Sequence, residues 1–348
     1  MPYRYLFATH AKLQEYLAEA YVRERGIDPT EVLLIRNRGT YTTAAASACA
    51  SVDGDRYLPT SGQNFAAHRR ANRRREAAFR REVLDRCAPG FRVYSAMYTY
   101  WYLRQLRRKS GSHHVMEDGL GSFQSLAEFD HFFRQAARPG PTWTRSQLRR
   151  RLCLTAAQRA GDIGGRELFA TTGEFLTTSP LCFPWVRPEQ RVVLERVFPP
   201  QYVGQYRGAT ILGTSCLVED GMFTPEAYLR TLGSIVRKIA DLGLPALYFK
   251  LHPRQARGPH ADAYRSAIRA GLPGVAVTEL EQTVSIERLA AGNPITLITG
   301  LSTLAFHVRG ADRRIVSYLD DLAAEQPRVL TERAQRGLAV FRSISTPL

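Results

Sequence analysis

The sequence has 348 residues, of which 44% are apolar, and this is enough to bury a hydrophobic core in each of two medium-sized domains. Its formal net charge is +16, yet only four of its 48 basic residues are lysines, a bias that GC-rich codon usage produces as readily as ligand binding does. Five scattered cysteines without a C-x-x-C pair predict neither a disulfide framework nor a zinc site. No apolar segment has the length of a signal-peptide core or a spanning helix, so we expect a cytoplasmic protein.

The first third of the chain alternates between strand and helix patterns. An apolar, β-prone run at 3–8 precedes a helical spacing at 13–22, and the continuous apolar run 32–35 follows. A run that is apolar on both faces is typical of a strand in a parallel sheet with both sides covered. The further elements expected in this part are a helix at 66–87, a strand at 91–94, a helix at 98–108 and a strand at 113–116.

The helix expected at 66–87 carries the densest basic run of the chain. Its arginines are Arg69, Arg70, Arg73, Arg74, Arg75, Arg80, Arg81 and Arg86. Glu76, Glu82 and Asp85 are interspersed, so a solvated surface is the first interpretation. Attraction to the acidic headgroups of a membrane surface, or to an anionic glycan, is the second. We do not expect a nucleic acid partner, because no aromatic residues interleave with the arginines.

The second half repeats the alternation after a less regular middle. Residues 123–180 have a helical, polar pattern, and the proline- and arginine-rich stretch 180–200 is typical of a linker. The elements expected beyond it are strands at 209–212, 246–251, 275–278, 295–299 and 314–318 and helices at 225–242, 260–270, 285–291 and from 302. The prediction is therefore two Rossmann-like α/β domains, at 1–200 and 201–325, with a terminal helical tail at 326–348.

Two acidic residues follow the strand expected at 113–116, in the motif Glu117-Asp118-Gly119. A parallel α/β sheet binds its ligands beyond the carboxyl ends of its strands, where Asp118 is expected to lie. Asp-Gly after a strand is also one of the commonest turns, and the same three residues recur at Glu219-Asp220-Gly221. Only the first copy continues into a glycine-rich loop, at 119–121, that lets a substrate approach the backbone. We therefore favour Asp118, with Asp220 as the alternative.

The motif His252-Pro253 ends the strand expected at 246–251. The proline restricts the backbone of the histidine before it, which therefore has little freedom to swing. Lys250 and Arg254 flank the motif, so the local field is positive and suits a phosphate group. A histidine that is simply part of the core is the alternative.

Hydroxyl and carboxylate side chains stand at two later helix starts. Ser302 and Thr303 follow the strand expected at 295–299 and a glycine turn, where they either cap the helix or bind a phosphate. Glu287 lies in the first turn of another helix, where an acid is favourable for the helix dipole. A carboxylate at this place in a nucleotide-binding domain could also bind two ribose hydroxyls.

Together these motifs resemble the bacterial sialyltransferases of the GT-B fold, including the lipooligosaccharide sialyltransferase and polysialyltransferase families. Glu117-Asp118-Gly119 is similar to the acidic motif of these families, His252-Pro253 to their HP motif, and Ser302-Thr303 to their paired hydroxyl motif. The start Thr9 to Gln14 resembles a T-x-x-x-L-Q start, and Leu212 to Ser215 resembles the strand that enters the nucleotide half. The likeness spans about residues 1–320. It departs at Thr303, where a second serine is usual, and at Glu287, which lacks a preceding proline.

The resemblance implies a GT-B fold, with two Rossmann-like domains facing across a cleft, and an inverting, metal-independent transfer of sialic acid from CMP-sialic acid to a glycan hydroxyl. It implies Asp118 as the general base, with Glu117 as runner-up, and His252 as the group that faces the departing phosphate. Ser302 and Thr303 would hold that phosphate, and Glu287 the ribose. The other donor-binding positions implied are Gly119, Gly213, Thr214 and Pro253. No cofactor is implied besides the donor substrate.

Two other functions fit the same residues. The first is transfer of another CMP-activated acid sugar such as Kdo, which would use the same phosphate contacts. The second is a non-catalytic, arginine-rich protein that binds acidic polymers, with Glu117-Asp118-Gly119 as a turn and His252 in the core. In either transferase the expected partners are a CMP-sugar donor and a glycan acceptor that is anionic or lipid-linked, with the protein peripheral on the inner face of the membrane.

Overall fold

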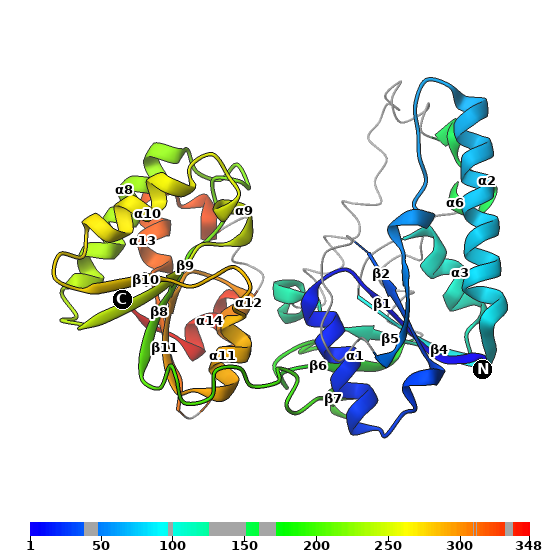
Figure 1. The fold of residues 1–348 in the computed structure, drawn as a ribbon, viewed down its shortest axis with the longest axis horizontal. Coiled ribbons are helices and arrows are strands. Elements are labelled where there is room, and N and C mark those ends of the chain that lie inside the picture. Colours follow the sequence, from blue (N-terminus) through cyan, green and yellow to red (C-terminus); the bar gives the residue numbers. More distant parts are fainter. Residues whose placement is uncertain are drawn as a thin grey trace. The chain divides into compact units, whose positions relative to one another are not determined.

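The computed structural model describes residues 1–37, 48–96, 100–124, 151–159, 172–308, 310, 312–330 and 337–348. The chain divides into two compact units, unit 1 at Met1–Val197 and unit 2 at Phe198–Leu348. Each unit is built on its own parallel sheet (Figure 1). Among the described residues, no helix combines the length and the apolar character that crossing a membrane requires.

Unit 1 contains a seven-stranded sheet in the order β3-β2-β1-β4-β5-β6-β7, in which every pairing is parallel. Its strands are β1 (Tyr3–Thr9), β2 (Val32–Arg36), β3 (Ala50–Asp53), β4 (Cys87–Ser95), β5 (Ser112–Met116), β6 (Thr172–Thr177) and β7 (Arg191–Val193). Its main helices are α1 (Lys12–Glu24), α2 (Phe65–Glu82), α3 (Trp101–Lys109) and the short α6 (Ala156–Arg159). The order of the strands reverses between β1 and β4, and in such sheets ligands bind outside the carboxyl ends of the strands at that point.

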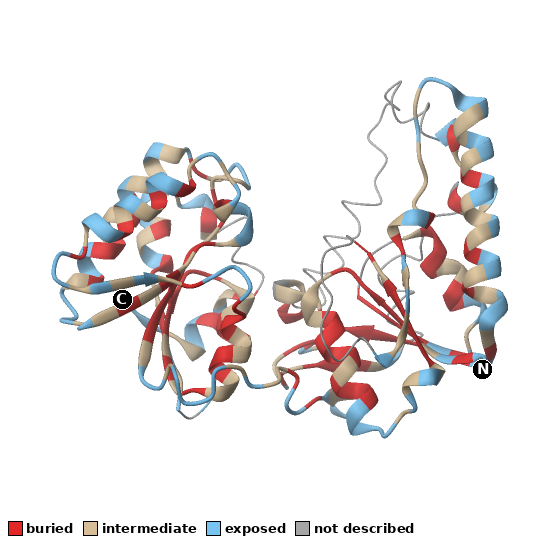
Figure 2. Cartoon of the chain, viewed as in Figure 1, coloured by how far each residue is buried: buried red, intermediate tan, exposed pale blue. Residues whose placement is uncertain are grey.

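Alternating side chains of β1 fill both sides of this sheet. Leu6 belongs to a core that includes Phe79 of α2 and Tyr102 of α3. Phe7 points to the opposite face, where its ring stacks on Tyr94 of β4 with centroids 4.5 Å apart. Successive residues of a strand point to opposite faces, so the apolar run buries both. Figure 2 shows the resulting buried layer along the strands, with α1 on one face and α2 and α3 on the other.

Unit 2 contains a six-stranded parallel sheet in the order β10-β9-β8-β11-β12-β13. Its strands are β8 (Ala209–Gly213), β9 (Ala246–Lys250), β10 (Ala276–Glu279), β11 (Ile295–Thr299), β12 (Arg314–Ser317) and β13 (Thr346–Pro347). Its helices are α8 (Pro225–Ala240), α9 (Pro253–Ala256), α10 (Ala261–Ala270), α11 (Ile286–Gly292), α12 (Thr303–Val308), α13 (Leu319–Glu325) and α14 (Leu338–Ile344). This is the strand order of a Rossmann fold, with the reversal between β8 and β11. The predicted fold class, α/β with two Rossmann-like domains, is confirmed.

The structure differs from the sequence prediction in the middle of the chain. The stretch 180–200, expected as a linker, lies largely within unit 1: Phe183 is fully buried and its ring lies 5.0 Å from that of Phe175 in β6. The strands β3, β6 and β7 were not expected, because they have only three to six residues and none is a continuous apolar run. Much of the stretch expected to be helical, 125–150 and 160–171, lies outside the described residues.

The end of the chain also differs from the prediction. Residues 326–348 were expected to form a separate helical tail, yet β13 pairs in parallel with β12 and completes the sheet of unit 2. Phe341 of α14 is fully buried, with its ring centroid 6.2 Å from that of Phe306 in α12. A two-residue strand with a proline gives no sequence pattern that could have predicted this pairing.

A buried histidine continues the aromatic stack of unit 1. The ring of His114 in β5 lies 4.4 Å from that of Tyr94, almost parallel to it. Its Nδ1 accepts the backbone N–H of Glu174 at 3.1 Å, and its Nε2 lies 2.9 Å from the Ser112 hydroxyl. Burial, together with the nearby charge of Arg92, lowers the pKa of His114 to about 3. The Glu174 Oε2 atom, 3.3 Å from Nδ1, does not reverse this, because that nitrogen already accepts a hydrogen bond.

This shift makes the stability of the protein depend on pH. The folded protein keeps His114 neutral, whereas the unfolded chain binds a proton below about pH 6.5, so stability falls as the pH drops from about 6.5 towards 3. At pH 5 we expect the loss to be about 2 kcal/mol. In urea denaturation, His114→Asn should cost stability at pH 8 and should cost about 2 kcal/mol less at pH 5. An equal cost at both pH values would contradict this assignment.

Candidate functional site

The loop after β5 carries the carboxylate that the sequence singles out in unit 1. Asp118 Oδ1 accepts hydrogen bonds from His10 Nε2 at 3.2 Å and from Gln14 Nε2 at 3.3 Å. The backbone N–H of Asp118 donates to the Ser122 hydroxyl at 2.7 Å. The Asp118 side chain is 22% exposed, whereas that of His10 is 4% exposed. Asp118 is therefore a fixed carboxylate that a ligand can reach.

Gly119 makes the turn that follows this carboxylate. Its φ of +56° lies in the left-handed region, where residues with a Cβ atom are strained. It begins the 3-10 turn Gly119–Phe123, which places Ser122 against the backbone of Asp118. The role of Gly119 in this structure is thus to form the loop, and its expected contact with a donor stays a prediction.

Glu117 is buried behind Asp118 and is engaged on the neighbouring strand. Its Oε2 atom accepts hydrogen bonds from the Thr177 hydroxyl at 3.0 Å, the Thr178 hydroxyl at 2.8 Å and the Thr178 N–H at 2.7 Å. The residue is 0% exposed. A carboxylate with three donors is stabilised as an anion and is not open to an acceptor hydroxyl, so these contacts favour Asp118 over Glu117 as the base. Glu117 instead joins the end of β5 to that of β6.

His10 and Gln14 were part of the motif at the start of the chain but received no role from the sequence. Gln14 Oε1 accepts the backbone N–H groups of His10 and Ala11, at 3.0 and 2.9 Å, and its Nε2 also donates to the Glu117 carbonyl at 3.3 Å. One side chain thus joins the end of β1 to the end of β5. The signal that could have found His10 is its place directly after β1, at the point where the strand order reverses.

In unit 2, His252 caps helix α9 at the end of β9. Its Nδ1 accepts the backbone N–H of Arg254 at 3.3 Å, so the ring proton is assigned to Nε2. Pro253 takes the first position of α9, where the missing N–H costs nothing. His252 is partly exposed rather than buried in the core. Its backbone and its Nδ1 atom are therefore fixed, and the ring proton lies on Nε2.

Thr214, which follows the neighbouring strand β8, holds the loop of His252 in position by hydrogen bonds. Its hydroxyl donates to Gln255 Oε1 and accepts the backbone N–H of His252 at 3.1 Å. Gln255 is 0% exposed, and its Oε1 also accepts the His252 N–H at 3.3 Å. The carbonyl of Gly213, just before Thr214, accepts the Tyr318 hydroxyl at 2.7 Å. Both residues, expected as donor-binding, hold the end of β8 in the described contacts.

The paired hydroxyls stand at the start of α12, next to the end of β8. Gly213 pairs with Thr299 in the sheet, and a Cβ atom at Gly213 would lie 3.5 Å from Leu304 of α12. The Ser302 hydroxyl accepts the Leu304 N–H at 3.3 Å, which makes Ser302 a helix cap. Within the described part of the chain, the Thr303 hydroxyl has no hydrogen-bond partner, so it is the hydroxyl of the pair that is open to a ligand.

Glu287 lies in the first turn of α11, as expected. Its Oε2 atom accepts the hydroxyl of Ser285 at 2.7 Å, while the same hydroxyl oxygen caps the helix by accepting the Arg288 N–H at 3.3 Å. The loop before α11 is tied to β9, because Lys250 Nζ donates to the carbonyls of Gln282 and Val284. The structure therefore brings the segment that leads to Glu287 beside the strand that ends at His252.

The second copy of the acidic motif is used differently. Asp220 forms an ion pair with Arg254, and its Oδ2 lies 3.4 Å from the Cys216 sulfur. The carboxylate of Asp220 raises the pKa of Arg254, so the pair is held in its charged form. A carboxylate paired with a guanidinium is a weak base, which favours Asp118 over Asp220 in the predicted role. Asp220 supports the loop of His252 instead.

A metal site is not formed by the residues that the structure describes: no group of three or more histidine, cysteine, aspartate or glutamate side chains could hold an ion there. The expectation of a metal-independent reaction stays a prediction. The five cysteines are free thiols, as the spacing indicates.

Comparison with known proteins gives structural likeness without sequence likeness. No family model matches the sequence, and no curated protein matches it. A protein described as a UDP-N-acetylglucosamine 2-epimerase from Listeria monocytogenes is 10% identical over 97% of this chain and 89% of its own, with a TM-score of 0.49. The wall teichoic acid polymerase TagF is 8% identical over 98% and 81%, with a TM-score of 0.47. The UDP-GlcNAc 2-epimerase of Methanocaldococcus jannaschii is 10% identical over 95% and 87%, with a TM-score of 0.43.

The contacts of Thr214 predict a local loss of stability in unit 2. Thr214→Val removes the hydroxyl but keeps the shape, which leaves the His252 N–H and Gln255 Oε1 without this partner. We expect the free energy of unfolding of unit 2 to fall by about 1–3 kcal/mol in urea denaturation. Thr214→Ser keeps the hydroxyl and should cost less than half as much. Equal effects of the two substitutions would contradict the role of the hydroxyl.

Proposed function

We propose that this chain is an inverting glycosyltransferase that moves sialic acid from CMP-sialic acid to a hydroxyl of a glycan. The observation that carries the proposal is the partly exposed carboxylate of Asp118, fixed by the buried His10 at the carboxyl edge of a Rossmann-like sheet. A fixed, accessible carboxylate is what a general base for an acceptor hydroxyl requires. The second unit supplies donor groups suited to a phosphate and a ribose, at the corresponding edge of its own sheet.

In the proposed reaction, the acceptor oxygen attacks the anomeric carbon of the sugar as its proton passes to Asp118. The bond between the anomeric carbon and the phosphate oxygen breaks, and the electron pair leaves with CMP. His10 and Gln14 hold one oxygen of Asp118 by hydrogen bonds, so the carboxylate does not have to be reoriented at the moment of transfer. His10 acts through Asp118 and is a positioning residue.

The proposed donor contacts lie in unit 2. His252 Nε2–H donates to the departing phosphate, because Nδ1 is already occupied by the Arg254 N–H. The Thr303 hydroxyl donates to the same phosphate, and Ser302 supports it by capping α12. The Glu287 carboxylate accepts the two ribose hydroxyls. Donors placed where negative charge develops lower the barrier most, and a monophosphate leaving group carries less charge than a diphosphate.

A Kdo-type CMP sugar is the second donor that these residues would accept, because the proposed contacts lie on CMP and not on the sugar. The anionic or lipid-linked acceptor, the peripheral membrane position and the cytoplasmic location remain parts of the proposal that are independent of this chemistry. The UDP-GlcNAc 2-epimerase of Methanocaldococcus jannaschii is known in complex with UDP-GlcNAc and UDP, so UDP-sugars are the comparison donors for an assay.

The first test of this proposal is activity with CMP-sialic acid and a lactose-type acceptor in EDTA. Asp118→Asn should lower kcat by about 10²–10⁴ because the proton acceptor is lost. His252→Ala should lower it by about 10²–10³ because a donor to the leaving group is lost. The measurement is the initial rate of CMP release, with CMP-Kdo and UDP-sugars as parallel donors.

The matched control is Asp220→Asn, the same change in the second copy of the acidic motif. It should leave kcat within a few-fold of wild type. If Asp220→Asn abolishes turnover while Asp118→Asn does not, the base has been assigned to the wrong unit. Strict dependence on a divalent metal, or wild-type activity of His252→Ala, would contradict the proposed reaction.

The second test is binding of CMP alone. CMP at one hundred times its dissociation constant should stabilise the protein by about 2.7 kcal/mol, which is measured as a rise in the melting temperature. Thr303→Val should weaken CMP binding about tenfold or more, because a hydrogen bond to a charged group is lost. Thr283→Val, the same change in an exposed loop of unit 2, is the control and should have no effect. Stabilisation by UDP but not by CMP would overturn the donor assignment.

A further inference from the structure

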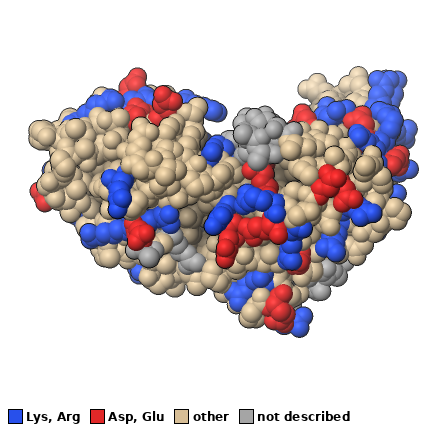
Figure 3. Space-filling model, turned by 60° about the horizontal axis from the view of Figure 1, so that its bottom comes forward, with Lys and Arg blue, Asp and Glu red and all other residues tan. Residues whose placement is uncertain are grey.

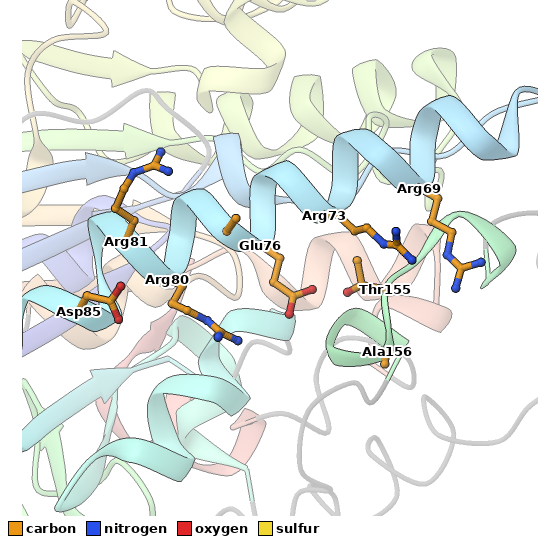
Figure 4. A pocket seen from close by; sticks show the side chains of 9 residues that line it. Arg69, Arg73, Glu76, Arg80, Arg81, Asp85, Thr155 and Ala156 are labelled. Atoms are coloured by element: carbon orange, nitrogen blue, oxygen red, sulfur yellow. The ribbon is translucent and has the colours of Figure 1, made fainter.

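The outer side of α2 forms one wall of a basic pocket in unit 1. Arg69, Arg73 and Arg80 line it together with Glu76, and Thr155 and Ala156 at the start of α6 form the opposite wall. The pocket has a volume of about 490 Å³. Figure 4 shows that these side chains of α2 point to the same side of the helix, towards Thr155. Arg69, Arg73, Glu76 and Arg80 follow one another at intervals of three or four residues. Residues at this spacing lie on the same face of a helix.

The two walls are held together on the buried side of α2. Asn72, which is 0% exposed, donates to the carbonyls of Thr60 at 2.9 Å and Cys153 at 2.8 Å. Gln158 of α6 donates to the Asn72 carbonyl at 3.4 Å, and its Oε1 accepts the Thr155 N–H at 3.1 Å. The backbones of the two walls are therefore held in position relative to each other.

Three of the four arginines that line this pocket have no acidic partner among the described residues. Within the described ranges, no ion pair involves Arg69, Arg73 or Arg80, whereas Arg81 pairs with Glu82 at 3.3 Å. Arg265 of α10, by contrast, forms an ion pair with Glu279 at 2.8 Å. On the face drawn in Figure 3, basic side chains gather at the right of the view, where α2 lies in Figure 1. Three unpaired guanidinium groups in one pocket indicate an external anion.

We propose that this pocket binds an anionic glycan chain that carries carboxylate or phosphate groups. Arg69 and Arg80 are eleven residues apart on one helix, so the row of guanidinium groups spans about 16 Å. That length covers a few sugar units, and guanidinium groups bind carboxylate and phosphate oxygens by charge-assisted hydrogen bonds. Glu76 lies in the same pocket and can pair with sugar hydroxyls, which a purely basic surface could not do, while the Thr155 hydroxyl caps α6 by accepting the Gln158 N–H at 3.2 Å.

The shape and composition of the pocket favour a glycan over other polyanions. A bilayer presents a flat surface, whereas the arginines lie with Glu76 and Asp85 in a hollow between α2 and α6, where hydroxyl-bearing sugar units can pair with the two carboxylates. Single-stranded nucleic acid is usually bound by aromatic side chains on which bases stack, and none of the described residues that line the pocket is aromatic. The pocket therefore fits a flexible chain with both charged groups and hydroxyls.

The inference deepens the proposed function, on which it rests for the view that the glycan is the acceptor. Asp118 and the pocket belong to the same unit, and in this proposal a glycan chain held by α2 extends to the base. Binding of the glycan alone does not depend on the reaction, which allows the two ideas to be tested separately.

The experiment measures the binding of fluorescently labelled polysialic acid to the full-length protein by anisotropy, without donor. The double variant Arg73→Gln and Arg80→Gln should weaken binding about tenfold or more, since two charge-assisted contacts are lost. The matched control is Arg70→Gln and Arg74→Gln, which removes the same charge from α2 outside the pocket and should weaken binding less than threefold. Ala156→Glu, compared with Ala156→Gln, should also weaken binding by placing a negative charge in the facing wall.

Each outcome decides the proposal. Equal losses in the two double variants, or no binding of polysialic acid at 150 mM salt, would overturn it. Tighter binding of acidic phospholipid vesicles or of a single-stranded oligonucleotide, lost in the pocket variant, would replace the glycan with that partner. Stabilisation of the pocket variant by CMP, measured as a rise in its melting temperature, separates the two ideas. If CMP stabilises this variant and its glycan binding is unchanged, only the pocket proposal is contradicted. If the variant selectively loses glycan binding and CMP does not stabilise it, only the transferase proposal is contradicted.

Discussion

The site in unit 1 depends on the burial of one of two adjacent carboxylates. The two carboxylates that follow β5 have different surroundings: Glu117 is 0% exposed, whereas the Asp118 side chain is 22% exposed. Glu117 faces inward, where an unpartnered charge would be costly, and donors from Thr177 at the end of β6 and from Thr178 just after it satisfy the charge. Asp118 then faces outward, to the side on which His10 and Gln14 follow β1. The carboxylate of Asp118 is therefore accessible, while that of Glu117 is buried and joins the end of β5 to that of β6.

In unit 2, neutral side chains satisfy the backbone N–H groups at the start of helix α9. The end of β9 turns sharply into α9, and the first N–H groups of a helix have no partner within it. His252 and Gln255 accept these N–H groups, and the Thr214 hydroxyl joins both residues to β8. As a result, one ring nitrogen of His252 is used to form the loop and the other keeps the proton. The same contacts that close the helix therefore determine which nitrogen can donate to a ligand.

The sequence predicts most of this fold because its core strands are continuous apolar runs between helical spacings. Val32–Arg36 and Ile295–Thr299 are examples, and both lie where the pattern indicates. Edge strands such as Ala50–Asp53 and Arg191–Val193 are short and partly exposed, so neither period nor hydrophobicity marks them. The site follows the same rule: motifs at strand ends were recognised, whereas the link from His10 to Asp118 spans 108 residues and depends on the strand order.

Net charge alone does not identify a binding surface in this chain. An arginine-rich composition arises from codon usage as readily as from function, and many arginines here contact the protein itself: Arg75 donates to the carbonyls of Arg56 and Leu58, on the same helix as the pocket. What distinguishes Arg69, Arg73 and Arg80 is that they share one helix face, line one pocket and lack an acidic partner among the described residues. Codon bias would place arginines without regard to the helix period. Selection for an anion would place them along one face, opposite a wall that the buried Asn72 holds in position.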